Sequence, residues 1–131
     1  MALTLHLITP TRQLVEAEVE QVVAPGAAGQ FGVLPEHVTF LGELDLGLLT
    51  YVEHGTTKRV VVHGGYAEVV DNVVTILADE AELPEEIDAT TVREELADVE
   101  RQLATIVGEP AEVDALLRER RRAHVRLAAA G

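Results

Sequence analysis

Two kinds of sequence meet at Leu83-Pro84-Glu85-Glu86-Ile87-Asp88. Before this stretch, short β-branched runs are separated by glycines, which is typical of strands and turns. After it, apolar residues recur at helical spacing and the chain ends in an arginine cluster. We therefore expect a β domain over residues 1–84 and a helical domain over residues 85–131. A β domain that carries a helical arm is more often part of a larger machine than an enzyme.

The composition excludes several classes of function. Of the 131 residues 47% are apolar, as in a globular protein. A net charge of −13 and an aromatic content of 3% argue against nucleic acid or an anionic membrane as the main partner. The absence of cysteine removes disulfides, thiolate chemistry and cysteine-based zinc sites. The N-terminus shows no signal-peptide pattern, and no apolar run reaches the length of about 18 residues that spans a membrane.

The sequence of the first domain predicts many short strands. Pro10, Pro25-Gly26 and the turn sequence Glu53-His54-Gly55-Thr56-Thr57 separate apolar runs, and Gly64-Gly65 permits a bulge or a sharp bend. The expected strands are residues 3–7, 14–24, 38–41, 44–46, 48–52, 59–63, 66–70 and 73–78, with a turn-rich connection over 29–37. Short strands at close spacing are typical of an all-β antiparallel sandwich or barrel.

Adjacent valines break the alternation that a half-buried strand requires. They occur at Val22-Val23, Val60-Val61-Val62, Val69-Val70 and Val73-Val74. Neighbouring residues of a strand point to opposite faces, so some of these side chains are expected to face outward. A partner or the helices would cover them, unless a small twisted sandwich simply leaves a few valines outside.

The sequence of the second domain predicts a two-helix antiparallel hairpin. A single apolar stripe runs through Ala89, Val92, Leu96, Val99, Leu103 and Ile106. Asp88 can cap this helix, although Thr91 and Glu94 have capping-box spacing one turn later. Gly108 ends it, and Pro110 suits the first turn of a second helix over about residues 111–129. Its stripe is thinner, because Arg120 and His124 interrupt it.

Such a hairpin buries too little surface to be stable alone, so it must pack on the sandwich or on another protein. Two nearly balanced docking positions would make it a switch. The stretch that holds Arg118, Arg120, Arg121, Arg122 and Arg126 contains only one acidic residue, Glu119. These arginines are either a solvated helix face near a helix C-terminus or a docking patch for an acidic partner.

The sequence predicts no catalytic residues and no metal site. The chain has no serine, which excludes a Ser-His-Asp triad, and it has no phosphate-binding loop. The histidines show no spacing of two metal ligands, and no local pair of carboxylates suggests acid–base catalysis.

Several stretches together resemble the epsilon subunit of bacterial F-type ATP synthases. They appear in order along nearly the whole chain: Ile8-Thr9-Pro10, residues 29–37, residues 62–69, Thr75-Ile76-Leu77-Ala78 and Glu86-Ile87-Asp88. The resemblance implies a β-sandwich followed by a helical hairpin. It also implies a non-catalytic rotor subunit of the central stalk that takes part in ATP synthesis and proton transport. Such a subunit lies at the cytoplasmic face of the bacterial membrane, bound only through the complex.

The resemblance assigns partners to two groups of residues. The loop that contains Gln30, Phe31, Glu36 and His37 resembles the one that faces the gamma subunit and the ring of c subunits. The second helix would meet the beta and alpha subunits of the catalytic head and inhibit ATP hydrolysis. The residues expected to contact an acidic segment of beta are Arg118, Arg120, Arg121, Arg122 and Arg126.

Some family members bind ATP on the folded arm, so the resemblance makes ATP a regulatory ligand with Asp88, Arg122 and Arg126 as its contacts. Ile87 and Asp88 keep the first two positions of that motif, while Thr91 and Val92 stand where it has arginine and alanine. The leading hypothesis is a coupling and inhibitory subunit. The alternatives are an ATP-sensing module of the same complex and a free-standing enzyme or adaptor, which would not co-purify with a membrane-bound ATPase.

Overall fold

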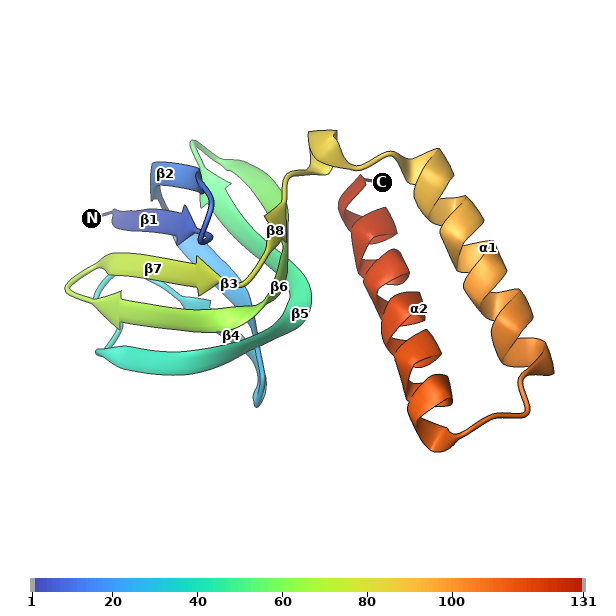
Figure 1. The fold of residues 1–131 in the computed structure, drawn as a ribbon. Coiled ribbons are helices and arrows are strands. Elements are labelled where there is room, and N and C mark those ends of the chain that lie inside the picture. Colours follow the sequence, from blue (N-terminus) through green and yellow to red (C-terminus); the bar gives the residue numbers. More distant parts are fainter. Residues whose placement is uncertain (1, 131) are drawn as a thin grey trace. The chain divides into compact units, whose positions relative to one another are not determined.

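The computed structural model describes residues 2–130 and divides between Leu83 and Pro84 into two compact units. The first unit holds the strands and the second holds the helices, as Figure 1 shows. This division lies one residue from the boundary expected after residue 84.

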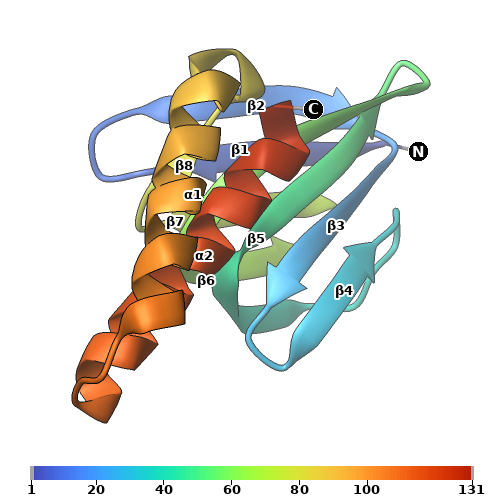
Figure 2. The ribbon, with the colours of Figure 1, turned by 90° about the vertical axis from the view of Figure 1, so that its right-hand side faces the viewer.

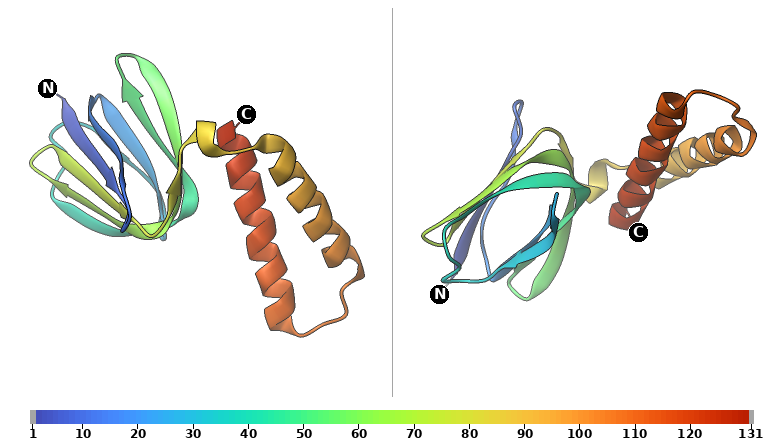
Figure 3. Two further views of the ribbon diagram at one scale, coloured as in Figure 1. Left: turned by 45° about the horizontal axis from the view of Figure 1, so that its top comes forward. Right: turned by 90° about the horizontal axis from the view of Figure 1, so that it is seen from below.

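The first unit is a strongly curved β-sandwich, which confirms the predicted fold class. Its sheet has the order β2-β1-β7-β6-β5-β3-β4, with the short β8 paired to β6. The sheet curves round so that opposite parts face each other (Figure 3, right). The strands are β1 (Leu3–Ile8), β2 (Gln13–Val19), β3 (Gln21–Gly26), β4 (Gly29–Val33), β5 (Phe40–Glu53), β6 (Thr56–Val70), β7 (Val73–Ala78) and β8 (Ala81–Glu82).

One strand pair departs from the expected antiparallel arrangement. β1 and β7 run parallel, from Thr4 opposite Val73 to Ile8 opposite Leu77. Every other recorded pair within residues 2–130 is antiparallel. The parallel pair brings the start of the chain beside the last full-length strand of the sandwich, a long-range pairing that local sequence patterns do not reveal.

Two long strands form the bend of the sandwich. β5 replaces the three short strands predicted over residues 38–52, and β6 runs through Gly64-Gly65 without a break. Along β6 the core residues are Val60 and Val62 before the glycines but Ala67 and Val69 after them. The inward face therefore changes at the glycines, as it must where a strand passes from one layer to the other.

The prediction of one strand over residues 14–24 is wrong. The segment forms β2 and β3, which pair with β1 and β5 respectively. Glu20 lies between them, and its backbone N–H donates to the carbonyl of Val52 at 2.8 Å. The break is invisible in the sequence because Glu20 continues the alternation of polar and apolar residues.

The segment expected as a turn-rich connection contains a strand. Gly29–Val33 is β4, which pairs with β3 from Gly26 opposite Gly29 to Val22 opposite Val33. Gly29 takes a φ of 128°, a conformation open to glycine, and so permits the tight connection between the two strands. Beyond Val33 the chain is irregular up to β5, which confirms the connection predicted up to residue 37 but not the strand predicted to start at residue 38.

Most of the doubled valines are buried, contrary to a simple reading of alternation. Val60, Val61 and Val62 are all at most 1% exposed, and Val73 alone among the doubled valines is exposed, at 38%. The central position of β6 explains the burial of Val60 and Val62, which both belong to the core. The larger exposed apolar side chains of this unit are instead Leu34, Val38, Leu41, Tyr66 and Leu77.

The second unit is the predicted hairpin of α1 (Ala89–Thr105) and α2 (Pro110–Ala130), preceded by the short 3-10 helix η1 (Pro84–Glu86). The two helices lie side by side (Figure 2). None of the six predicted stripe residues of α1 is exposed, and Val92 and Val99 are buried. α1 ends three residues before Gly108, where Ile106 turns to an extended conformation, and Pro110 opens α2 as expected.

Candidate interaction surfaces

The loop around β4 brings three aromatic rings together. Phe31 on β4 and Phe40 at the start of β5 lie 5.0 Å apart between ring centroids, and the His37 ring meets Phe40 edge-on at 6.2 Å. A hollow of about 360 Å³ beside Phe31 and Phe40 is also lined by Gln30 and Glu43. Of the four predicted loop residues, Gln30 and Phe31 therefore share one hollow.

Glu36 and His37 line a second hollow. It has a volume of about 380 Å³ and also contains Asp71 and Asn72 from the β6–β7 turn. Glu36 has a φ of 71°, in the left-handed region that most L residues avoid. Its backbone N–H donates to the Asn72 side-chain oxygen at 2.7 Å, and this bond holds the loop in place. A glycine would adopt this backbone conformation without strain.

An apolar face covers the outer side of β5, β6 and β7. Tyr66 lies directly opposite Leu77 in the β6–β7 pairing, and Leu41 lies opposite Glu68 in the β5–β6 pairing. These side chains are 71% (Leu41), 56% (Tyr66) and 51% (Leu77) exposed. Exposed apolar side chains on one sheet face are typical of a protein-docking surface.

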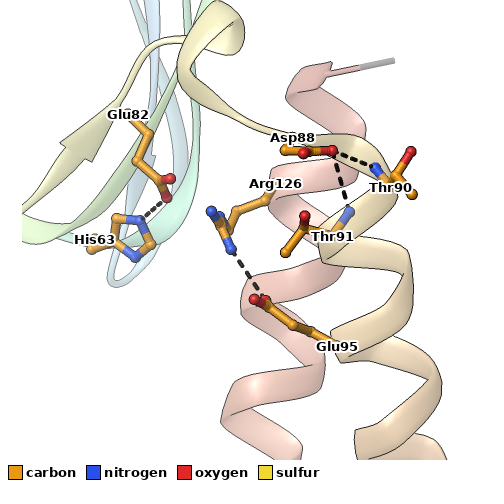
Figure 4. Close-up of polar contacts among 7 residues, drawn as sticks. All are labelled: His63, Glu82, Asp88, Thr90, Thr91, Glu95 and Arg126. Atoms are coloured by element: carbon orange, nitrogen blue, oxygen red, sulfur yellow. Dashed lines mark hydrogen bonds and ion pairs between the residues drawn. The ribbon is translucent and has the colours of Figure 1, made fainter.

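Asp88 caps α1, as predicted. Its carboxylate accepts hydrogen bonds from the backbone N–H groups of Thr90 (3.0 Å) and Thr91 (3.3 Å), as Figure 4 shows. The bond from the Thr91 backbone, then that from the Thr91 side chain, and to a lesser degree the bond from Thr90 lower the pKa of the Asp88 carboxyl. The first helix therefore starts at Asp88 and not at the alternative capping box of Thr91 and Glu94.

The arginine cluster divides into two groups. Arg122 and Arg126 line a groove of about 420 Å³ between the helices. Arg118, Arg120 and Arg121 are exposed and are not among its lining residues. In the groove, Arg126 Nη1 lies 3.4 Å from Glu95 Oε2 on α1, a contact drawn in Figure 4.

The groove brings together only part of the expected ATP contacts. Arg122 and Arg126 share it, whereas Asp88 is occupied as a cap and does not line it. Three carboxylates, Glu95, Asp98 and Glu119, line the same groove and would oppose a triphosphate. ATP binding stays a prediction.

Sequence reasoning missed two contacts of β8. His63 Nε2 lies 3.0 Å from Glu82 Oε1, and Arg12 Nη2 donates to the carbonyl of Ala81 at 3.2 Å. These partners are 19 and 69 residues apart in the sequence, so no local pattern could have found them.

Residues 2–130 provide neither a metal-binding cluster nor a helix that could span a membrane. This part of the chain contains no group of three or more His, Cys, Asp or Glu side chains that could hold a metal ion. Neither of its long helices has the length and apolar character that crossing a membrane requires.

Comparison with known proteins identifies the family. Residues 2–84 match the family described as the β-sandwich domain of the ATP synthase delta/epsilon chain. An ATP synthase epsilon chain of Nitratidesulfovibrio vulgaris is 45% identical over 105 residues, covering 80% of this chain and 78% of the relative. Another, from an Anaeromyxobacter species, is 40% identical over 131 residues, covering 100% of this chain and 99% of the relative.

Solved structures agree with this result. A chain of the Euglena gracilis mitochondrial ATP synthase, from its OSCP/F1/c-ring structure, matches with a TM-score of 0.72 at 26% identity, covering 96% of this chain and 75% of the other. A chain of the Tetrahymena thermophila central stalk and c-ring shares the fold, with a TM-score of 0.64 at 15% identity, covering 98% and 96%. With the sandwich matched by the family and the whole chain matched by epsilon chains, this protein belongs to the family of ATP synthase epsilon subunits.

Proposed function

We propose that the chain is a non-catalytic central-stalk subunit of a bacterial, proton-translocating F-type ATP synthase, where it couples the catalytic head to the c-ring. The observation that carries the proposal is the match to an epsilon chain over the full 131 residues at 40% identity. The stalk and ring named in the structures of similar chains support the same place in the complex. The subunit would lie at the cytoplasmic face of the membrane, held there by the complex.

The sandwich offers two surfaces for this role. The apolar face of Leu41, Tyr66 and Leu77 suits the gamma subunit, because burying exposed apolar side chains stabilises a permanent interface. The loop with Gln30, Phe31, Glu36 and His37 suits the c-ring, since it combines an aromatic cluster with a carboxylate. Glu36 would supply a carboxylate for this contact.

The hairpin acts as a brake on ATP hydrolysis. Arg118, Arg120 and Arg121 are exposed on α2 and suit an acidic segment of the beta subunit. Arg126 is only 20% exposed and pairs with Glu95 in the groove, so it contacts beta only after the helices separate, whereas Arg122 lines the same groove but is exposed. Arg126 pairs with Glu95 in the closed hairpin and would pair with a carboxylate of beta in the separated one. Because one ion pair replaces the other, the two states of the hairpin would be similar in free energy.

Deletion of residues 88–131 in the assembled complex tests the brake. ATP synthesis should be retained and ATP hydrolysis should rise. A milder variant replaces Arg118, Arg120 and Arg121 by glutamine, and its control replaces Arg93 and Arg101 on α1. The α2 variant should raise hydrolysis and the α1 control should not. Unchanged hydrolysis in the deletion would show that the hairpin is not a brake in this enzyme.

Nucleotide sensing is a second candidate function, which the shared groove of Arg122 and Arg126 favours. Binding of ATP there would hold the hairpin closed and release the brake. Calorimetry of the full chain with ATP tests it, with Arg122→Gln as the groove variant and Arg118→Gln as the control. Binding that the groove variant loses and the control keeps would support sensing, and no heat of binding in the unmodified chain would reject it.

A further inference from the structure

The two end strands of the sheet differ in the side chains that they carry. The sheet begins with β2 and ends with β4, and among residues 2–130 β4 pairs with β3 alone. β2 carries the exposed Glu16 and Glu18, and charged side chains of this kind discourage a further strand from pairing with an edge. β4 has no charged residue and no proline. It lies beyond β3 at the margin of the sandwich (Figure 2), so its outer edge lacks the protection that β2 has.

The register of β4 shows which backbone groups face this edge. In an antiparallel pair, residues that exchange two hydrogen bonds alternate with residues that exchange none. Pro25 has no N–H, so its pairing with Gln30 is of the second kind. The two-residue turn between Gly26 and Gly29 requires the same alternation. The N–H and carbonyl groups of Gln30 and Gly32 therefore point away from β3, and both residues are exposed.

Side chains at the two ends of β4 indicate what kind of segment would pair with it. At the start of the strand, Phe31, Phe40 and Glu43 line the hollow of about 360 Å³. Two aromatic rings and a carboxylate suit the side chain of a lysine or an arginine. Beyond the end of the strand, Leu34 and Val38 are 59% and 75% exposed and suit apolar side chains.

The charged residues around this edge are acidic. Glu36 follows β4 and Glu43 lies on β5, and both are exposed. The basic residues of the sandwich sequence are Arg12, Lys58 and Arg59. None of them belongs to β3, β4 or β5. A basic segment is therefore attracted to this edge, and an acidic segment is repelled.

We propose that the outer edge of β4 receives an extended basic segment of a partner polypeptide as an added strand. The backbone groups of Gln30 and Gly32 bond to this segment, and a lysine or arginine of the segment enters the hollow beside Glu43. In this mode of recognition the main-chain bonds supply affinity and the side-chain pocket supplies specificity. That the partner is another subunit of the ATP synthase rests on the proposed function.

Substitution of Gly32 separates the backbone bond from the side chain. Gly32→Pro removes an N–H that faces the edge without removing a bond to β3, and edge strands tolerate proline. Gly32→Ala is the matched control, because it keeps the N–H and its Cβ meets no atom within 4 Å. Urea denaturation establishes that both full chains are folded. Gly32→Pro should bind an ATP synthase complex depleted of this subunit about three- to tenfold more weakly than Gly32→Ala, the loss of one hydrogen bond.

Glu43→Gln tests the basic side chain in the hollow. It should weaken binding to the same depleted complex about threefold at low ionic strength and less at high ionic strength, because salt screens an exposed ion pair. Glu18→Gln, on the opposite end strand, is the control and should leave the affinity unchanged. Equal affinities of these two variants would contradict a basic side chain beside Glu43.

Hydrogen exchange of the unmodified chain needs no variant. The Gln30 and Gly32 amides should exchange at least about tenfold more slowly in the assembled complex than in the isolated chain. Unchanged exchange at these amides, or equal affinities of Gly32→Pro and Gly32→Ala, would overturn the added strand and leave the proposed function standing. A dimer of the isolated chain that Gly32→Pro dissociates would assign the edge to self-association and overturn the added strand as well. An unmodified chain that does not bind the complex at all would overturn both proposals.

Discussion

Gly65 is the residue on which the bend of β6 depends. It has a φ of 117°, and a Cβ added there would lie 2.0 Å from the carbonyl oxygen of Leu77 and 2.8 Å from Cα of Ala78. Both atoms belong to the backbone of the neighbouring strand, so neither can move without breaking the β6–β7 pairing.

We therefore expect Gly65→Ala to lower the free energy of unfolding by about 3 kcal/mol or more, the sum of a strained φ and an overpacked contact. Urea denaturation of the full chain measures it. Gly32→Ala is the matched control, because a Cβ at Gly32 meets no atom within 4 Å. Equal stability of the two variants would contradict the role given to Gly65.

Glu36 allows the opposite substitution, in which glycine replaces a strained residue. Its φ of 71° strains an L residue, and its backbone bond to Asn72 needs no side chain. Glu36→Gly should stabilise the chain by about 0.5–1 kcal/mol, because the relief of strain exceeds the entropy that glycine adds to the unfolded state. Glu36→Ala removes the same carboxylate but keeps the Cβ, so it should bring no such gain. A gain in both variants would trace the effect to charge instead of backbone conformation.

Among the elements, α1 depends on a titratable cap. The pKa of the Asp88 carboxyl is lower in the folded chain than in the unfolded chain. Ionised Asp88 therefore stabilises the folded chain fully at pH values above the pKa that Asp88 has when the chain is unfolded. That contribution is lost as the pH falls through the lower, folded value. The protection factors of the Thr90 and Thr91 amides, which compare exchange with the intrinsic rate at the same pH, should therefore fall on acidification.

Asp88→Asn separates the charge from the cap. Asparagine also accepts hydrogen bonds from the first turn but does not titrate, so the acid-induced loss of protection at Thr90 and Thr91 should disappear. Asp88→Ala should show low protection at every pH. If Asp88→Asn kept the full acid dependence, another group would be responsible for it.

The helices could be predicted from sequence more closely than the strands. Asp88, Pro110 and the stripe from Ala89 to Ile106 act within one or two helical turns, so their meaning is local. Strand limits depend on pairing with distant segments. β2 ends before Glu20, whose backbone N–H donates to the carbonyl of Val52 on β5. β1 pairs in parallel with β7, although most of the sandwich sequence lies between these two strands.

The same difference applies to the candidate surfaces. The family resemblance paired Arg122 with Arg126, and the structure adds that both line one groove with Glu95 from α1. The contact of His63 with Glu82 and the left-handed backbone of Glu36 arise from the folded sheet. Neither has a local sequence pattern.

At the scale of the whole molecule, the two units differ in the core that each possesses. The sandwich has a continuous cluster of buried side chains drawn from β1 to β8, including Leu5, Leu49 and Ile76. The helices bury mainly Val92, Val99, Ala123 and Ala129, which are small side chains. Burial of so little apolar surface offsets only a small part of the conformational entropy that ordering two helices costs.

Residues 1–83 alone should consequently unfold in one cooperative transition, whereas residues 84–131 alone should be largely unfolded. Circular dichroism during thermal unfolding of each piece and of the full chain measures this difference. Ala123→Leu in the helical piece is an informative variant, because it adds apolar volume where Ala123 and Val99 line the groove and should raise the helix content. A helical piece that melts sharply without a partner would show that the hairpin needs no docking surface. The exchange between docking positions on which the brake depends would then lose its physical basis.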